Sequence, residues 1–243
     1  MLHMTDMHID LGYVAGNNRL CGTPLCCRFT DGPAPNASAA AGYWGNTDGN
    51  CDIPYRTAEQ AMSFLESKDI DLVVWTGDNI GHNDWTQEMS TQFENTKILA
   101  KAFKKHLPNA RIIGTPGNHE CFPVNQCAFG GELFSWMNEQ LAEAYEDLLS
   151  EASLITLREY GYYAEPIEEK NLIVVAYNSQ VCANDDYYLL RDPTDPSGFI
   201  EWYKDILYDA ESKGQIVYTI GHAPPQGCSP EWGARFGALI DRF

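Results

Sequence analysis

Five side chains in this sequence are of types that bind divalent metal ions, and each follows an apolar stretch of chain. They are Asp6, His8, Asp78, Asn118 and His222. Together they offer carboxylate oxygens, imidazole nitrogens and an amide oxygen, a mixture that suits zinc, manganese or iron and argues against a thiolate site. A carboxylate such as that of Asp78 can also bridge two ions. The pattern therefore predicts a metal site.

Taken alone, most of these motifs have an ordinary structural explanation. Asp6 can cap a strand end, Gly77-Asp78 can form a turn, and His222 can be a hydrogen-bonded structural residue. The stretch Gly117-Asn118-His119-Glu120 is more specific, because its side chains have no obvious use in packing. The order of the four motifs, each behind an apolar strand, is what favours the metal site. Their glycines let the chain turn sharply and approach an ion closely.

The elements that must position these residues alternate along the chain. Apolar runs predict strands over 1–5, 71–76, 111–115, 162–164, 172–177 and 215–220. Helical spacing predicts helices over 56–67, 87–106, 131–150 and 197–213, and residues 11–55 are predicted to be a loop. This alternation predicts a layered α/β fold. Ligands of such sheets bind outside the carboxyl ends of the strands, so the motifs are expected to meet there.

Composition limits both the size of the fold and its partners. The chain has 243 residues, 44% of them hydrophobic, which is enough for one large α/β domain. Its net charge of −18 makes it a poor partner for nucleic acid and, at neutral pH, for anionic lipid. Carboxylates gain protons in an acidic compartment, where this repulsion would be weaker. No stretch approaches ~20 apolar residues, so no transmembrane segment is expected.

Eight cysteines indicate the compartment in which the protein folds. None has the paired CxxC spacing of a zinc ribbon, so a disulfide framework formed in an oxidising compartment is expected. Asn36-Ala37-Ser38 is an N-glycosylation sequon in the same cysteine-rich loop. We therefore expect a secreted or lysosomal protein. Since no signal peptide precedes the first strand, we also expect the natural N-terminus to be missing.

The order DxH, GD, GNH[ED], GH resembles that of the calcineurin-like metallophosphoesterases. Further stretches are similar to the acid sphingomyelinase subgroup: Leu25-Cys26-Cys27-Arg28, Ala41-Gly42-Tyr43-Trp44-Gly45, Cys51-Asp52-Ile53-Pro54-Tyr55-Arg56-Thr57, Trp75-Thr76-Gly77-Asp78, Thr194-Asp195-Pro196 and Ile220-Gly221-His222-Ala223-Pro224-Pro225. The resemblance covers nearly the whole chain. It implies that residues 1–243 are a metallophosphoesterase catalytic domain, folded as an α/β/β/α sandwich.

The resemblance also implies a cofactor and a reaction. Asp6 and His8 would bind the first of two zinc ions, Asp78 would bridge both, and Asn118 and His222 would bind the second. Such a pair clamps a phosphodiester and directs a bridging hydroxide in line at phosphorus. The implied reaction is hydrolysis of sphingomyelin, a phospholipid presented at a membrane or micelle surface, to ceramide and phosphocholine.

Two further histidines match the catalytic histidines of the family. We favour His119 as the general acid and His82 as the phosphate binder, although these roles could be exchanged. Glu120 is predicted to orient His119 by a hydrogen bond. His3 and His106 are expected to be structural.

The same resemblance implies a pairing of the cysteines. It gives Cys21–Cys26, Cys27–Cys51 and Cys182–Cys228. Cys121 and Cys127 remain, and we infer that they form a fourth disulfide, which would hold the loop that carries His119.

Two pieces of the family pattern are not found in residues 1–243: the amino-terminal saposin-like domain and the final Gly-His-x-His motif. We expect a C-terminally truncated sandwich, with weakened metal affinity and little or no activity for these residues alone. Two alternatives stay open, a secreted phosphodiesterase of nucleotides or other small phosphodiesters and a non-catalytic truncated binding protein. The cysteine-rich loop and the glutamate at 120, where an aspartate is the alternative, favour the lipid substrate, and Tyr43, Trp44 and Trp85 could form an apolar rim for it.

Overall fold

Two three-stranded sheets lie at the centre of the computed structural model, which describes residues 1–243. The first sheet has the order β1 (Leu2–Met4), β2 (Leu72–Trp75), β3 (Arg111–Gly114), and all its strands are parallel. The second has the order β4 (Tyr162–Ile167), β5 (Leu172–Tyr177), β6 (Ile216–Ile220). In it β4 runs antiparallel to β5, and β6 runs parallel to β5. All six strands lie where apolar runs predict them.

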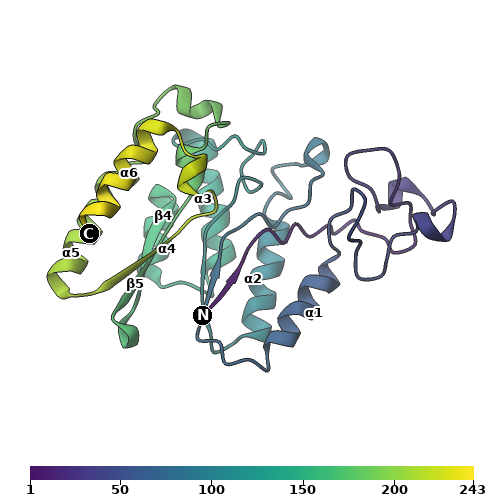
Figure 1. The fold of residues 1–243 in the computed structure, drawn as a ribbon, viewed down its shortest axis with the longest axis horizontal. Helices are drawn as coiled ribbons and strands as arrows, with labels where there is room; N and C mark the ends of the chain where they lie inside the picture. The colour runs from purple at the N-terminus through teal and green to yellow at the C-terminus, as the bar shows by residue number, and fades with distance from the viewer.

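Six α-helices surround the sheets. They are α1 (Tyr55–Leu65), α2 (Glu94–His106), α3 (Gly131–Tyr145), α4 (Glu151–Tyr160), α5 (Phe199–Lys213) and α6 (Pro230–Arg242). Figure 1 shows α5 and α6 together at one end of the molecule, with α1 and α2 on the other side of the sheets. Each helix buries one apolar side. In α2 the buried side contains Leu99 and Phe103, and the exposed side contains Lys104 and Lys105.

The alternating side chains of β5 show how the layers stack. Val174 and Ala176 belong to the larger core, which also contains side chains of the first sheet and of α1 to α4. Val175 and Tyr177 point the other way, into a second core that also contains side chains of α5 and α6. Since successive residues of a strand face opposite sides, the two sheets lie face to face with helices outside each. The predicted α/β/β/α sandwich is confirmed.

Two predicted helices differ clearly in their bounds from the structure. The predicted helix 131–150 ends at Tyr145, and it is followed by a separate helix that was not predicted, α4, which Ser150 caps by accepting a hydrogen bond from the Ser153 amide. The predicted helix 87–106 begins only at Glu94, after a short 3-10 turn and irregular chain. Local capping and turns set these ends, and hydrophobic spacing does not encode them.

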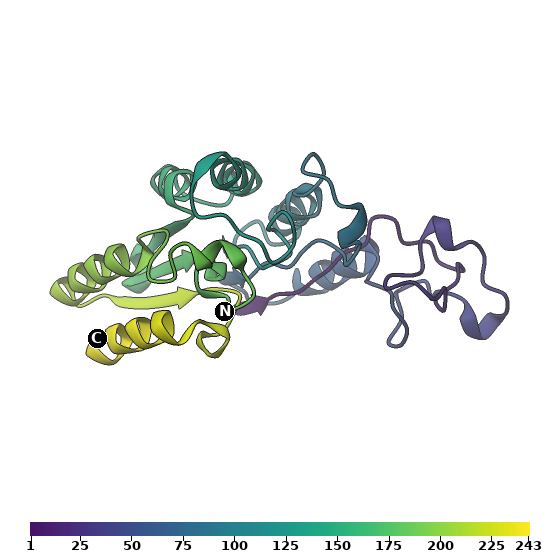
Figure 2. The same cartoon turned by 90° about the horizontal axis from the view of Figure 1, so that it is seen from above.

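Residues 11–54, here called the disulfide lobe, project from the body of the molecule at the end opposite α6 (Figures 1 and 2). The lobe contains only isolated bridges and two short 3-10 helices, Phe29–Asp31 and Ala37–Ala39. Its own cluster of buried apolar residues has three members. A core of this size cannot hold 44 residues, so the two disulfides within the lobe are needed for its shape.

No helix of the structure is both long and apolar enough to span a membrane.

Candidate active site

The predicted metal-binding residues converge because of the parallel strands of the first sheet. Asp6 and His8 follow β1, Asp78 follows β2, and Asn118 follows β3, so all three segments leave the same edge. His222 follows β6 of the facing sheet and reaches the same place. The five residues span more than 200 positions of sequence, and only the sandwich brings them together.

Asp78 lies at the centre of this group. Its Oδ2 atom is 3.5 Å from Nε2 of His8 and 3.4 Å from Nε2 of His222. Asp6 Oδ1 lies 3.8 Å from the same nitrogen of His8. One ligand atom each from Asp6, Asp78 and His222 lie within 4.8 Å of one another. A carboxylate with an imidazole on each side is the arrangement that two ions sharing one ligand require.

The two imidazoles next to Asp78 are held in the form that binds metal. His8 Nδ1 lies 2.9 Å from the carbonyl oxygen of Ile80, and His222 Nδ1 lies 2.8 Å from that of Thr76. A carbonyl only accepts, so each Nδ1 carries the hydrogen and each Nε2 keeps its lone pair for a ligand. These residues therefore fit a pair of divalent ions.

Asn118 also fits the role of a ligand. The side-chain nitrogen of Asn118 donates to Asn125 Oδ1 at 2.8 Å, and its side-chain oxygen, Oδ1, has no hydrogen-bond partner in the protein. The neighbouring amide of His119 donates to Asp78 Oδ1 at 2.9 Å, so the segment lies directly against the central carboxylate.

Backbone strain is concentrated at these positions. Asp6, His8 and Asp78 adopt positive φ angles of 52°, 35° and 54°, a region that non-glycine residues seldom enter. Close approach explains the glycine at 117, since a Cβ there would lie 2.1 Å from Asp78 Oδ1. Strain at several ligand positions is common at functional sites, where the surrounding fold compensates for it.

Three histidine rings form a second group beside the central carboxylate. The ring centroids of His8 and His82 are 4.1 Å apart, those of His8 and His119 are 4.8 Å apart, and those of His82 and His119 are 4.7 Å apart. The two predicted catalytic histidines thus lie next to a predicted metal ligand. His119 is buried and its Nδ1 has no hydrogen-bond partner, with Asp84 Oδ1 at 3.7 Å.

The environments of these two histidines move their pKa values in opposite directions. A hydrogen bond to Asp52 raises the pKa of His82 above its ordinary value. Burial lowers the pKa of His119, and the nearby charges of His8 and His82 add to this effect. Adjacent groups with diverging pKa values are typical of acid–base catalysis.

The predicted role of Glu120 is wrong. Its buried carboxylate accepts hydrogen bonds from the amides of Asp78, Asn79 and Gly117 at 2.8, 2.9 and 2.7 Å, and a fourth from Asn79 Nδ2 at 3.1 Å. With its oxygens occupied by these donors, Glu120 ties the Gly-Asp loop to the Gly-Asn-His-Glu loop. Burial raises its pKa, although the backbone amides oppose this shift.

Sequence reasoning missed three residues that shape the site. Asp52, in the disulfide lobe, hydrogen-bonds His82. Gln92 donates to the carbonyl oxygens of His119 and Cys121 at 2.7 and 3.0 Å, and Asn95 donates to that of Ile9 at 2.6 Å. Their only signal in the sequence was an aspartate directly after Cys51, a glutamine just before α2 and an asparagine in its first turn.

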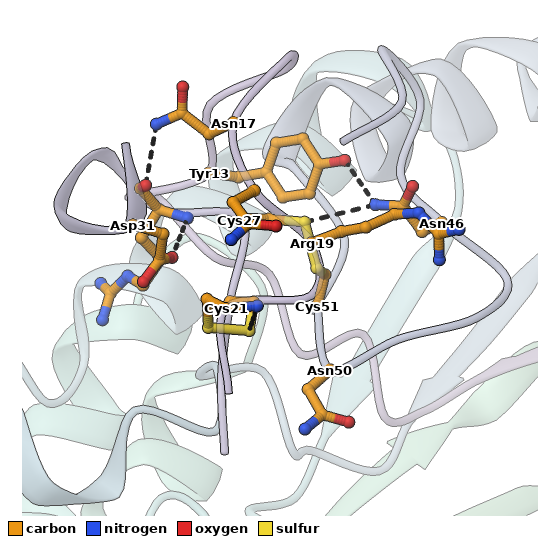
Figure 3. The surroundings of a disulfide bond; sticks show 12 residues. Tyr13, Asn17, Arg19, Cys21, Cys27, Asp31, Asn46, Asn50 and Cys51 are labelled. Atoms are coloured by element: carbon orange, nitrogen blue, oxygen red, sulfur yellow. Dashed lines mark hydrogen bonds between the residues drawn. A yellow bond between two sulfur atoms is a disulfide. The ribbon is translucent and has the colours of Figure 1, made fainter. Parts of the chain in front are cut away.

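The structure joins the eight cysteines as Cys21–Cys26, Cys27–Cys51, Cys121–Cys127 and Cys182–Cys228, the same pairs given in the sequence analysis. Figure 3 shows the surroundings of those in the lobe, where the Asn46 side chain donates to both Tyr13 Oη and Cys27 Sγ. Cys121–Cys127 closes the loop that follows His119. Both the lobe and this loop are thus tied beside the site.

Comparison with known proteins agrees with this geometry. The model of the calcineurin-like phosphoesterase family matches residues 1–237, so the chain belongs to that family. The chain is also similar along its whole length to sphingomyelin phosphodiesterases, with 36% identity to that of Bos taurus, 34% to that of Homo sapiens and 33% to sphingomyelin phosphodiesterase B of Dictyostelium discoideum. The predicted resemblance is confirmed. The chain spans about two fifths of the length of these relatives: 39%, 39% and 38% respectively.

Proposed function

We propose that the protein containing this chain hydrolyses the phosphodiester bond of sphingomyelin, releasing ceramide and phosphocholine. The observation that carries the proposal is the position of Asp78 Oδ2 between His8 and His222, beside the histidines at 82 and 119. A phosphodiester needs charge neutralisation on one side and a proton for its leaving oxygen on the other, and the two groups supply these separately. The names of the similar proteins support the choice of lipid.

Two zinc ions are the proposed cofactors, held by Asp6, His8, Asp78, Asn118 and His222. When bound, they supply positive charge and make the attacking water more acidic. The protein's contribution is to present the ligand atoms in fixed geometry. Ile80 and Thr76 hold the two imidazoles, and Glu120 holds the loop of Asp78 against that of Asn118.

We assign the proton donor to His119 and the binding of a phosphoryl oxygen to His82. His119 is buried, so its proton is shielded from bulk water, and its Nδ1 has no partner in the protein. His82 is about half exposed, as a residue that meets an incoming headgroup must be. Each ring lies less than 5 Å from that of His8, so both are close enough to act on one phosphate.

A lipid surface is the proposed partner. Tyr43, Trp44 and Trp85 expose 62, 53 and 56% of their surface, and aromatic side chains of this kind prefer the lipid–water boundary. The net charge of −18 favours zwitterionic over anionic headgroups. The four disulfides support a secreted or lysosomal location, where such a surface would be met.

The test uses the full-length protein and measures phosphocholine release from sphingomyelin micelles at pH 5. We expect turnover that a chelator abolishes and zinc restores, and that Asp78→Asn removes. Asp71→Asn is the matched control, because Asp71 is exposed and pairs only with Lys170. A nucleotide phosphodiester runs in parallel. Turnover of the nucleotide alone would overturn the substrate assignment. No turnover of either, with metal bound, would favour the non-catalytic binding protein.

A further inference from the structure

Asp52 holds His82 at two points. One carboxylate oxygen accepts the backbone N–H of His82 at 2.6 Å, and the other lies 2.8 Å from its ring Nδ1. Only 10% of the Asp52 side chain is exposed, against 48% of that of His82. A carboxylate that binds both the backbone and the ring of one residue fixes the position of the residue and also the rotation of its side chain.

The glycine at position 81 makes room for this contact. A Cβ on Gly81 would lie 2.8 Å from Asp52 Oδ2, closer than Cβ atoms approach other heavy atoms in proteins. Its next neighbours, at 3.4 and 3.5 Å, are Asn83 Oδ1 and the Ile9 carbonyl. The backbone of Gly81 does not have a positive φ angle, so the missing side chain is explained by the approach of Asp52 and not by a turn.

The path of the chain brings Asp52 to this point. Ile9 forms parallel bridges with Ile53 on one side and with Ile80 on the other, and the amide of Asp10 donates to the Ile53 carbonyl at 2.8 Å. Asp52 is therefore placed one residue before one bridge, and His82 two residues after the other. On its amino-terminal side Asp52 adjoins Cys51, which is bonded to Cys27.

The chemistry of the pair sets the tautomer of the ring. An ionised carboxylate can only accept, so His82 Nδ1 must carry the hydrogen that it donates to Asp52. The other nitrogen, Nε2, is then the one free to meet a substrate. If Asp52 were an asparagine, its amide could donate to Nδ1 instead, and the hydrogen of the neutral ring would move to Nε2.

We propose that Asp52 is a positioning residue of the active site, through which the disulfide lobe fixes the orientation and tautomer of His82. Asp52 does not touch the substrate. The inference rests on the proposed function for its kinetic consequence, whereas its structural part concerns only the protein's own atoms. It assigns the lobe a part in the reaction, since no other segment supplies a carboxylate to the His82 ring within hydrogen-bond distance.

Two variants test the proposal in different ways. Asp52→Asn replaces the carboxylate by an amide of the same shape. Gly81→Ala keeps the carboxylate but pushes it away from His82 with a methyl group. Asp48→Asn is the matched control, because Asp48 lies in the same lobe, is 70% exposed and contacts Arg19 only.

The first measurement is the tautomer of His82, read from the nitrogen chemical shifts of selectively labelled full-length protein. At a pH high enough for the ring to be neutral, the hydrogen should lie on Nδ1 in the unmodified protein and in Asp48→Asn. It should move to Nε2 in Asp52→Asn and become a mixture in Gly81→Ala. This readout needs neither metal nor substrate, and a change of stability alone would not move it.

The second measurement is the rate of sphingomyelin hydrolysis. We expect kcat to fall about 10- to 100-fold in Asp52→Asn and in Gly81→Ala, with KM changed less than about threefold, as for other residues that orient a catalytic histidine. If Asp52→Asn does not fold, Gly81→Ala alone decides. An unchanged tautomer, or unchanged kcat in a folded variant, overturns the proposal. An unmodified protein that does not hydrolyse sphingomyelin overturns the proposed function, while the tautomer still tests the role of Asp52.

Discussion

Replacing Glu120 by glutamine should destabilise the protein far more than its small change in shape suggests. The carboxylate accepts four N–H hydrogen bonds, two at each oxygen. In glutamine one oxygen becomes an amide that only donates, so two of the four donors lose their acceptor in either orientation of the side chain. A hydrogen bond to a charged group contributes about 1.5–3 kcal/mol, so the gross loss is about 3–6 kcal/mol.

Part of this loss is returned, because burial of the charge is itself costly, as the raised pKa of Glu120 indicates. We expect a net decrease of about 2–4 kcal/mol in the free energy of unfolding. For a chain of 243 residues this lowers Tm by roughly 4–16 °C.

The assay is urea and thermal unfolding at pH 7 with the disulfides intact. Glu88→Gln is the matched control, since Glu88 is exposed and should change stability by less than about 0.5 kcal/mol. If the Tm of Glu120→Gln equals that of the control, the loop-tying role of this carboxylate is refuted.

Three further predictions concern the reaction, the pH dependence of stability and modification. His119→Ala should slow sphingomyelin hydrolysis about 10²- to 10⁴-fold but slow a p-nitrophenyl phosphodiester less than tenfold, since that leaving group needs no proton; equal losses on both would contradict the assigned acid. Burial raises the pKa of Asp186 to about 6 in the folded protein. The contribution of its protonated carboxyl to the free energy of unfolding is therefore full below about pH 4 and is lost as the pH rises through 6. Asp186→Asn should therefore gain about 1–2 kcal/mol relative to the unmodified protein between pH 4 and 7, after discounting for solvent screening, and a pH-independent difference in urea unfolding would refute this. Asn36 is exposed and its side-chain oxygen accepts from Ser38 and Ala39, which leaves the amide nitrogen free, so secreted protein should lose one glycan on Asn36→Gln; an unchanged gel mobility with and without glycosidase would exclude the site.

The central strands and their order of motifs could be predicted because the signals are local. Leu72–Trp75 is buried at every position, and a fully buried strand reads as a continuous apolar run. Asp78 follows this strand, and His222 follows the apolar run of β6, of which only Ile220 is buried, so the fold class and the candidate metal ligands could be predicted together. The break between α3 and α4 could not, because it depends on one serine cap rather than on periodicity.

The supporting contacts of the site are long-range and could not be predicted. Asp52 is separated from His82 by 30 residues, and the path between them follows an irregular lobe without any repeating pattern. The role of Glu120 was predicted wrongly because its neighbour in sequence, His119, is not its partner in space. Its partners belong mainly to the loop after β2, 41 and 42 residues away, and proximity in sequence gives no information about such a contact.

Because Asp52 directly follows Cys51, formation of the Cys27–Cys51 disulfide affects how firmly Asp52 holds His82. Before the bond to Cys27 forms, Asp52 is held near His82 by the pairing of Ile53 with Ile9 and by a lobe whose buried cluster has three residues, one of them Cys27 itself. The loops after the strands belong to the sandwich, whose core does not involve the lobe's cysteines. A chain in which Cys27 and Cys51 are still reduced would thus have its candidate metal ligands in place, with the contact between Asp52 and His82 held less firmly. Formation of the Cys27–Cys51 bond would then restrict the lobe and, with it, the Asp52 side chain that contacts His82.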